Sequence, residues 1–126
     1  MIKVLIADDQ ELIRESLKIV LGANEDMEVI GIAENGEEVL SQVKKEKPDV
    51  ILMDIRMPGI DGVECTRLVK EKYPNIYIML CTGFDEFEYA KEAVHLEIKE
   101  YMLKPVNATE LSESLTNLKH TLDRER

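Results

Sequence analysis

Apolar residues along the chain fall into two patterns, short continuous runs and longer stretches with helical spacing. The short runs are typical of β-strands, because they are rich in Val and Ile and are bounded by polar or turn residues. They predict strands over residues 2–7, 29–33, 50–53, 76–81 and 100–103. The third and fourth runs are almost wholly apolar, which is typical of central parallel strands that are covered on both faces.

Between the strands, apolar residues recur every three or four positions, as on one face of a helix. The predicted helices carry Ile13, Leu17, Val20 and Leu21, ending near Gly22; Val39, Leu40 and Val43, ending before Pro48; Cys65, Leu68 and Val69, ending before Pro74; Phe87, Ala90, Ala93 and Val94, over residues 85–96; and Leu111, Leu115, Leu118 and Leu122, beginning near Ala108. Five βα units predict an α/β fold, a doubly wound five-stranded parallel sheet flanked by five helices. With no internal repeat or linker, we expect residues 1–126 to form a single domain.

Composition and charge narrow the class of ligand. The 126 residues are 44% hydrophobic, enough for one core. The net charge of −10 disfavours standing contact with nucleic acid or an anionic membrane and favours cations.

No stretch approaches the roughly 20 apolar residues of a membrane span. Because the start MIKVLIADD also lacks a small-residue cleavage site, we expect a cytoplasmic protein. Cys65 and Cys81 are predicted to be small buried hydrophobic residues in a reducing compartment.

Polar residues follow four of the predicted strands at their carboxyl ends, where ligands gather in an open α/β sheet. Three carboxylates crowded there would repel one another, and a hard divalent cation such as Mg²⁺ relieves that repulsion. An ammonium and a hydroxyl would serve an anionic oxygen. The set therefore predicts a phosphoryl site with a carboxylate nucleophile. Its members are Asp8 and Asp9 after the first strand, Asp54 after the third, Thr82 after the fourth and Lys104 after the fifth.

Each part alone has an ordinary structural explanation. An acid pair after a strand often caps a helix, and a Lys-Pro pair is usually a loop. A purely structural explanation leaves the joint occurrence of the parts unexplained.

A phosphatase of the haloacid dehalogenase class would need an Asp two residues after its nucleophile, where this chain has Arg56 or Gln10. A flavodoxin-like flavin carrier would need a Ser/Thr/Gly-rich phosphate loop where the chain has ADDQE. His95 and His120 are expected to be solvated surface residues.

Four motifs occur in order, namely IADDQ (6–10), ILMDIRMPGIDG (51–62), LCTGF (80–84) and YMLKP (101–105). With them the chain resembles the receiver domain of bacterial two-component response regulators over essentially its whole length. The resemblance implies a flavodoxin-like fold with strand order 2-1-3-4-5. It also implies a signalling switch rather than an enzyme, in which Asp54 accepts a phosphoryl group from a sensor histidine kinase.

The resemblance further implies a role for each site residue. Mg²⁺ would be held by Asp9 directly, by Asp8 through water, by Asp54, and by the backbone carbonyl of Arg56. Lys104 and Thr82 would contact the phosphoryl group, Tyr101 would swing inward as the coupled aromatic residue, and the Lys104–Pro105 peptide would be cis. Arg56 and Phe84 would set the rate of phosphoryl loss, and the bulky ring of Phe84 would make that loss slow.

Around the phosphoacceptor, Pro58 and Gly62 are expected to shape the following loop, Gly62 by unusual backbone angles, while Asp61 caps the third helix. Glu97 departs from the glycine that the family usually has at its position, so the fourth helix is expected to end differently. That difference would affect the conformation of the face formed by the fourth helix, fifth strand and fifth helix. Members of this family commonly form homodimers through this face.

Phosphorylation of a receiver shifts an equilibrium between two surfaces, which we expect to control a transcription regulator. The segment GFDEFEYAKEA (83–93) is similar to receivers joined to AraC-type domains, and the first half is similar to those joined to LuxR-type domains. DNA would be contacted only through an output domain outside these residues, toward which residues 119–126 extend the last helix. The alternative is a stand-alone receiver that acts by protein–protein contact.

Overall fold

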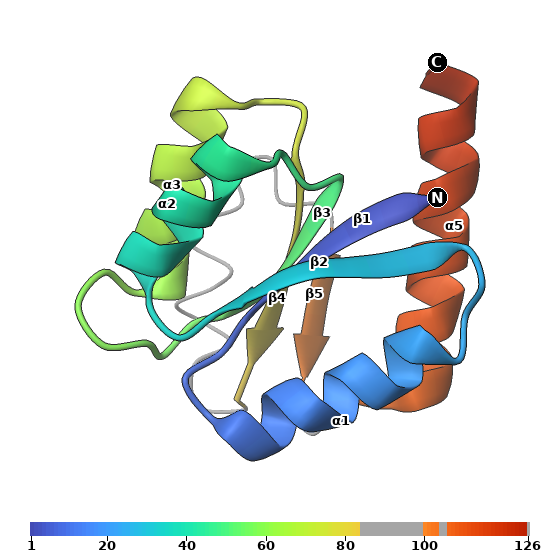
Figure 1. Cartoon of the computed structure of the whole chain (residues 1–126), viewed down its shortest axis with the longest axis horizontal. Coiled ribbons are helices and arrows are strands. Elements are labelled where there is room, and N and C mark those ends of the chain that lie inside the picture. Colours follow the sequence, from blue (N-terminus) through green and yellow to red (C-terminus); the bar gives the residue numbers. More distant parts are fainter. Residues whose placement is uncertain (84–99, 104–105, 126) are drawn as a thin grey trace.

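The computed structural model describes residues 1–83, 100–103 and 106–125 (Figure 1). The strands are β1 (Ile2–Ala7), β2 (Met27–Ala33), β3 (Val50–Asp54), β4 (Tyr77–Thr82) and β5 (Glu100–Leu103). The described helices are α1 (Glu11–Gly22), α2 (Gly36–Lys45), α3 (Gly62–Lys72) and α5 (Ala108–Glu125). The helix predicted over residues 85–96 lies outside the described residues.

All five strands pair in parallel in one sheet, in the order β2-β1-β3-β4-β5. This confirms the predicted parallel sheet and its strand order. The chain crosses from β2 over β1 to β3, so strand order reverses between β1 and β3. Ligands of open α/β sheets bind at such a switch point, outside the carboxyl ends of the strands.

Two strands end one residue later than the sequence pattern predicts. Asp54 is the last residue of β3 and pairs with Cys81, and Thr82 is the last residue of β4 and pairs with Leu103. Both residues are therefore held by the hydrogen-bonded ladder rather than by a loop. The remaining differences are at strand starts, since β2 begins at Met27 instead of residue 29 and β4 begins at Tyr77 instead of residue 76.

Side chains of the strands alternate between two hydrophobic cores, as the two-residue period of a strand requires. On one face, Leu5, Ile51 and Ile78 pack with residues of α2 and α3. On the other, Ile6 and Leu52 pack with residues of α1 and α5. Figure 1 shows these helix pairs on opposite sides of the sheet. Burial of each large aliphatic side chain contributes about 1.5–3 kcal/mol, so the sheet is a firm platform for its carboxyl edge.

Both cysteines are buried and neither forms a disulfide, which confirms the prediction that they act as small core residues. Burial, together with the negative charges of Glu37 and Asp61, raises the pKa of the Cys65 thiol to about 12. A thiol with this pKa forms almost no thiolate at neutral pH and is a poor nucleophile. Within the described part of the chain, none of the helices has the length and apolar character needed to cross a membrane.

Candidate functional site

Three carboxylates meet at the carboxyl edge of the sheet, at the switch point. Asp8 and Asp9 follow β1 directly, and Asp54 ends the neighbouring β3. One oxygen from each of the three lies within 4.8 Å of the others. Asp8 is 2% exposed and Asp54 3% exposed, whereas Asp9 is open to solvent. The structure thus brings together the three acids that the sequence places at this edge.

The donor set fits a hard divalent cation. Two buried carboxylates and a third beside them repel one another, and a bound cation would offset that charge. Carboxylate oxygens are the ligands that Mg²⁺ and Ca²⁺ prefer. Mg²⁺ suits a site that supplies few carboxylates and leaves positions for water and phosphate oxygens. Since Asp9 is exposed, the cluster is open to solvent on its side.

Asp8 is fixed through its backbone and through its side chain. Its N–H donates to the Ala33 carbonyl at 3.0 Å, and its own carbonyl accepts from Arg14 Nη1 at 2.9 Å. The Gln10 N–H donates to Asp8 Oδ1 at 2.9 Å, closing a local turn of the kind that Asp favours. The start of the loop between β1 and α1 is therefore held in one conformation, and the Asp8 carboxylate with it.

Arg14 is a site neighbour that the sequence interpretation missed. It is only 6% exposed, and besides Asp8 it contacts Glu34 Oε1 through Nη2 at 3.3 Å. A signal was present, because Arg14 precedes Leu17 by three residues and Leu21 by seven. A charged residue in that register lies on the buried face of the helix.

The loop after β3 approaches Asp54 through Gly62, but not for the reason expected from the sequence. Unusual backbone angles were predicted for Gly62, and this prediction is wrong: among the described glycines the positive φ, 76°, belongs to Gly59. Gly62 is required by space instead, since a Cβ there would lie 2.1 Å from the Asp54 carbonyl oxygen and 2.8 Å from Ile55 Cα. The Gly62 N–H donates to the Ile55 carbonyl at 2.7 Å, which fastens the start of α3 to the end of β3.

Asp61 is the N-cap of α3, as the sequence predicts. Its Oδ1 accepts a hydrogen bond from the Glu64 N–H at 2.8 Å, satisfying one of the free donors of the first turn.

The structure describes some of the other predicted site residues but not all of them. Thr82 is fully buried, and its hydroxyl donates to the Gly83 carbonyl at 2.8 Å. Arg56 lies in the loop after β3 with its side chain exposed. Tyr101 lies on β5, paired with Leu80 in β4. Five residues with predicted roles lie outside the described residues, namely Phe84, His95, Glu97, Lys104 and Pro105, and the predicted cis peptide lies there too. His120 is exposed on α5, as predicted.

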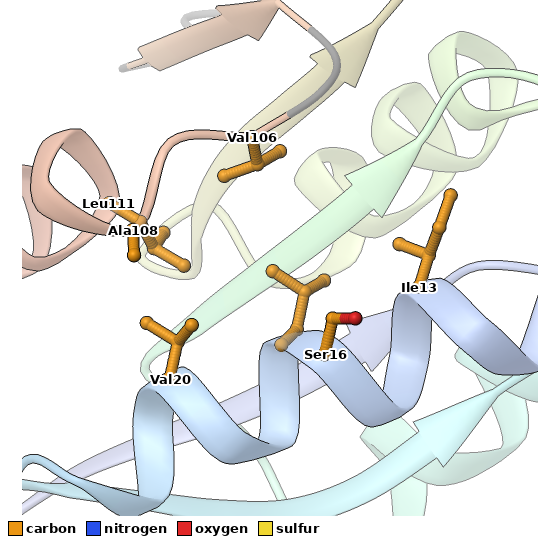
Figure 2. Close-up of a pocket in the computed structure, with 7 residues that line it drawn as sticks. Ile13, Ser16, Val20, Val106, Ala108 and Leu111 are labelled. Carbon is orange, nitrogen blue, oxygen red and sulfur yellow. The ribbon is translucent and has the colours of Figure 1, made fainter.

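A separate apolar pocket of about 440 Å³ lies between α1 and the start of α5. Figure 2 shows Ile13 and Val20 on α1 facing Val106 and Leu111 across it. Its described lining holds no titratable side chain, so it suits apolar contact rather than a reaction. Nearby on α1, Leu12 and Ile19 are 80% and 74% exposed.

A doubly wound parallel sheet with this strand order places the chain in the flavodoxin-like class, and the acidic cluster at its switch point could hold a cation. The family model for the response regulator receiver domain matches residues 4–116. The chain therefore belongs to the response regulator receiver domain family.

Individual relatives agree with this membership. The uncharacterized transcriptional regulatory protein YesN of Bacillus subtilis (strain 168) is 35% identical over 130 residues, which cover 99% of this chain and 34% of YesN. The transcriptional regulatory protein LnrK of the same organism is 39% identical over 108 residues, covering 86% of this chain and 49% of LnrK. The chain thus spans no more than about half the length of these relatives.

Among solved structures, the REC domain of AraT, a response regulator from Geobacillus stearothermophilus, is 41% identical with a TM-score of 0.92. The match covers 98% of this chain and 97% of that domain. The receiver fold is therefore shared over nearly the whole chain, and the chain is homologous to transcriptional response regulators.

Proposed function

We propose that Asp54 is the phosphoacceptor of a signalling switch and takes its phosphoryl group from a sensor histidine kinase. The observation that carries this proposal is the position of Asp54. It is a buried carboxylate on the last residue of a central strand, with oxygens of Asp8 and Asp9 within 4.8 Å. A carboxylate held this firmly is a well-placed nucleophile for an in-line displacement.

In the reaction, an Asp54 oxygen forms a bond to phosphorus while the bond between phosphorus and the donor histidine nitrogen breaks. The electron pair of that bond remains on the imidazole, which takes up a proton. We propose that Asp9 and Asp54 hold Mg²⁺ directly, with Asp8 acting through water and the Arg56 carbonyl as a further ligand. When bound, the ion would neutralise charge on the phosphoryl oxygens. Lys104 is proposed to pair with the same oxygens.

The switch itself is proposed to depend on Thr82. Its hydroxyl donates to the Gly83 carbonyl, so it must give up this bond to reach a phosphoryl oxygen. The new charge on Asp54 favours that exchange, because a hydrogen bond to an anionic oxygen is roughly twice as strong as a neutral one. Tyr101, on the adjacent β5, is proposed to swing inward with it. The outcome is a shifted equilibrium between two surfaces.

We propose further that the phosphoaspartate hydrolyses slowly, because the bulky ring of Phe84 would screen it from water, with Arg56 as the second modulating residue. Loss of the phosphoryl group within seconds, in the presence of Mg²⁺, would contradict this proposal.

The output is proposed to be control of transcription, supported by the names of the regulators to which the chain is similar. Residues 1–126 would act as a single receiver domain of a cytoplasmic regulator. DNA would be contacted only through an output domain outside these residues, toward which the tail 119–126 would lead. A homodimer would form through β5, α5 and the segment between β4 and β5. A stand-alone receiver acting by protein contact is the alternative.

The test is incubation with acetyl phosphate and Mg²⁺, followed by intact-protein mass spectrometry. Wild-type protein should gain one phosphoryl group, and Asp54→Asn should gain none. Asp61→Asn is a matched control, because Asn caps a helix as well as Asp and that residue is outside the acidic cluster. Labelling that survives Asp54→Asn contradicts the assignment.

A further inference from the structure

Arg14 is a buried charge that the proposed phosphoryl transfer does not use. It lies on α1 beside Leu17 and Leu21 and is 6% exposed. Removing a charge from water costs several kcal/mol, so a buried arginine without strong partners is uncommon. Its contacts therefore indicate what it is for.

The contacts of Arg14 are unequal. Nη1 donates to the Asp8 carbonyl at 2.9 Å, a buried hydrogen bond. Nη2 lies 3.3 Å from Glu34 Oε1, but the Glu34 side chain is 60% exposed, so water screens this ion pair. Nε is buried and has no hydrogen-bond partner among the described residues. The firmest contact of the guanidinium is thus the backbone of a residue in the acidic cluster.

We propose that Arg14 is a positioning residue for the divalent-cation site, an inference that rests on the proposed function. Its guanidinium fixes the Asp8 carbonyl, and with it the peptide that joins Asp8 to Asp9. Both carboxylates are thereby kept turned toward Asp54. Groups that orient metal ligands in this way change metal affinity by about 10–100-fold when they are removed.

Charge and position make opposite predictions for Arg14. Its positive charge alone disfavours a cation nearby, so a neutral residue would tighten Mg²⁺ binding if charge were the main effect. Loss of the bond to Asp8 releases the loop, and the affinity falls if positioning is the main effect. The sign of the change in Mg²⁺ affinity therefore separates the two roles. A merely structural role would leave the Mg²⁺ affinity unchanged.

The experiment is calorimetric titration of the unphosphorylated protein with Mg²⁺, with circular dichroism to establish that each variant is folded. Arg14→Met, which keeps the length but not the donors, should weaken Mg²⁺ binding by about tenfold or more. Arg14→Lys keeps a charge and one donor and should recover part of the loss. Glu34→Gln is the matched control, and its affinity should stay within about twofold of wild type because it removes only the screened ion pair.

Two results overturn the inference. One is Arg14→Met binding Mg²⁺ as tightly as wild type or more tightly, and the other is Glu34→Gln weakening it equally. Should Arg14→Met not fold, the comparison moves to Arg14→Gln and Arg14→Lys, and wild-type affinity in both overturns it. Failure of the proposed function is distinct, since it appears as no Mg²⁺ binding by wild type or as unchanged binding by Asp9→Asn.

Discussion

Replacement of Gly62 by alanine tests how the end of β3 is held. The added Cβ would lie 2.1 Å from the Asp54 carbonyl oxygen, 2.8 Å from Ile55 Cα and 2.9 Å from the Asp54 carbonyl carbon. All three are backbone atoms of a buried strand end, so no rotamer change relieves the overlap. Overpacking costs typically about 1–3 kcal/mol and occasionally more, and the rigidity of this contact places it at about 3 kcal/mol or above.

The same change at Gly22 is the matched control. Gly22 is the last residue of α1, and a Cβ there meets nothing within 4 Å. Alanine is favoured over glycine in helices by roughly 0.5–1 kcal/mol, so Gly22→Ala should be neutral or slightly stabilising. The two variants add the same methyl group and differ only in what surrounds it.

The assay is urea unfolding followed by far-ultraviolet circular dichroism, since the chain has no tryptophan. With a slope of about 1–3 kcal/mol per molar urea, the Gly62→Ala midpoint should fall by at least about 1 M. The rate of Asp54 phosphorylation should fall by more than the unfolded fraction explains, because the strained contact is to its own carbonyl. A Gly62→Ala protein within about 0.5 kcal/mol of wild type would refute the spatial argument.

Three further outcomes are expected. Asp61→Ala should cost about 1 kcal/mol in the free energy of unfolding and leave Mg²⁺ affinity unchanged, whereas Asp61→Asn should preserve both; a loss of Mg²⁺ binding would mean that Asp61 is a ligand. Burial raises the pKa of Cys65 from 9.0 to about 12, so the unfolded chain loses this proton first. The stability that it contributes should be complete below 9.0 and decline toward 12, more steeply for wild type than for Cys65→Ala; parallel declines in urea unfolding would contradict this. Mg²⁺ at a hundredfold excess over its Kd should stabilise wild type by about 2.7 kcal/mol but not Asp9→Asn, and equal rises in Tm would exclude Asp9 as a ligand.

The fold was predictable because each level of the sequence agrees with the others. Apolar runs mark the strands, helical spacing marks the described helices, and their alternation leads to a parallel sheet. The predicted ends of three strands differ from the observed ends by one or two residues. The reason is physical, since Asp54 and Thr82 are polar and look like loop residues, yet the ladder extends to them.

The convergence of Asp8, Asp9 and Asp54 was predictable for a related reason. Carboxyl ends of parallel strands meet at one edge, so residues distant in sequence become neighbours once strand order is known. The role of Gly62 was not predictable, because it depends on how closely α3 approaches the end of β3. Arg14 was missed because a charge on an apolar helix face is usually expected to reach solvent, and its partner is a backbone carbonyl that leaves no mark in the sequence.

The most direct test of the central claim is to identify the phosphorylated residue. Borohydride reduces an acyl phosphate to the corresponding alcohol, so protein treated with acetyl phosphate and Mg²⁺ can be reduced, digested and mapped by mass spectrometry. The account predicts homoserine at position 54, dependent on Mg²⁺ and absent from untreated protein. Homoserine at position 8 or 9, or a stable phosphoryl group on a histidine or hydroxyl residue, would contradict it.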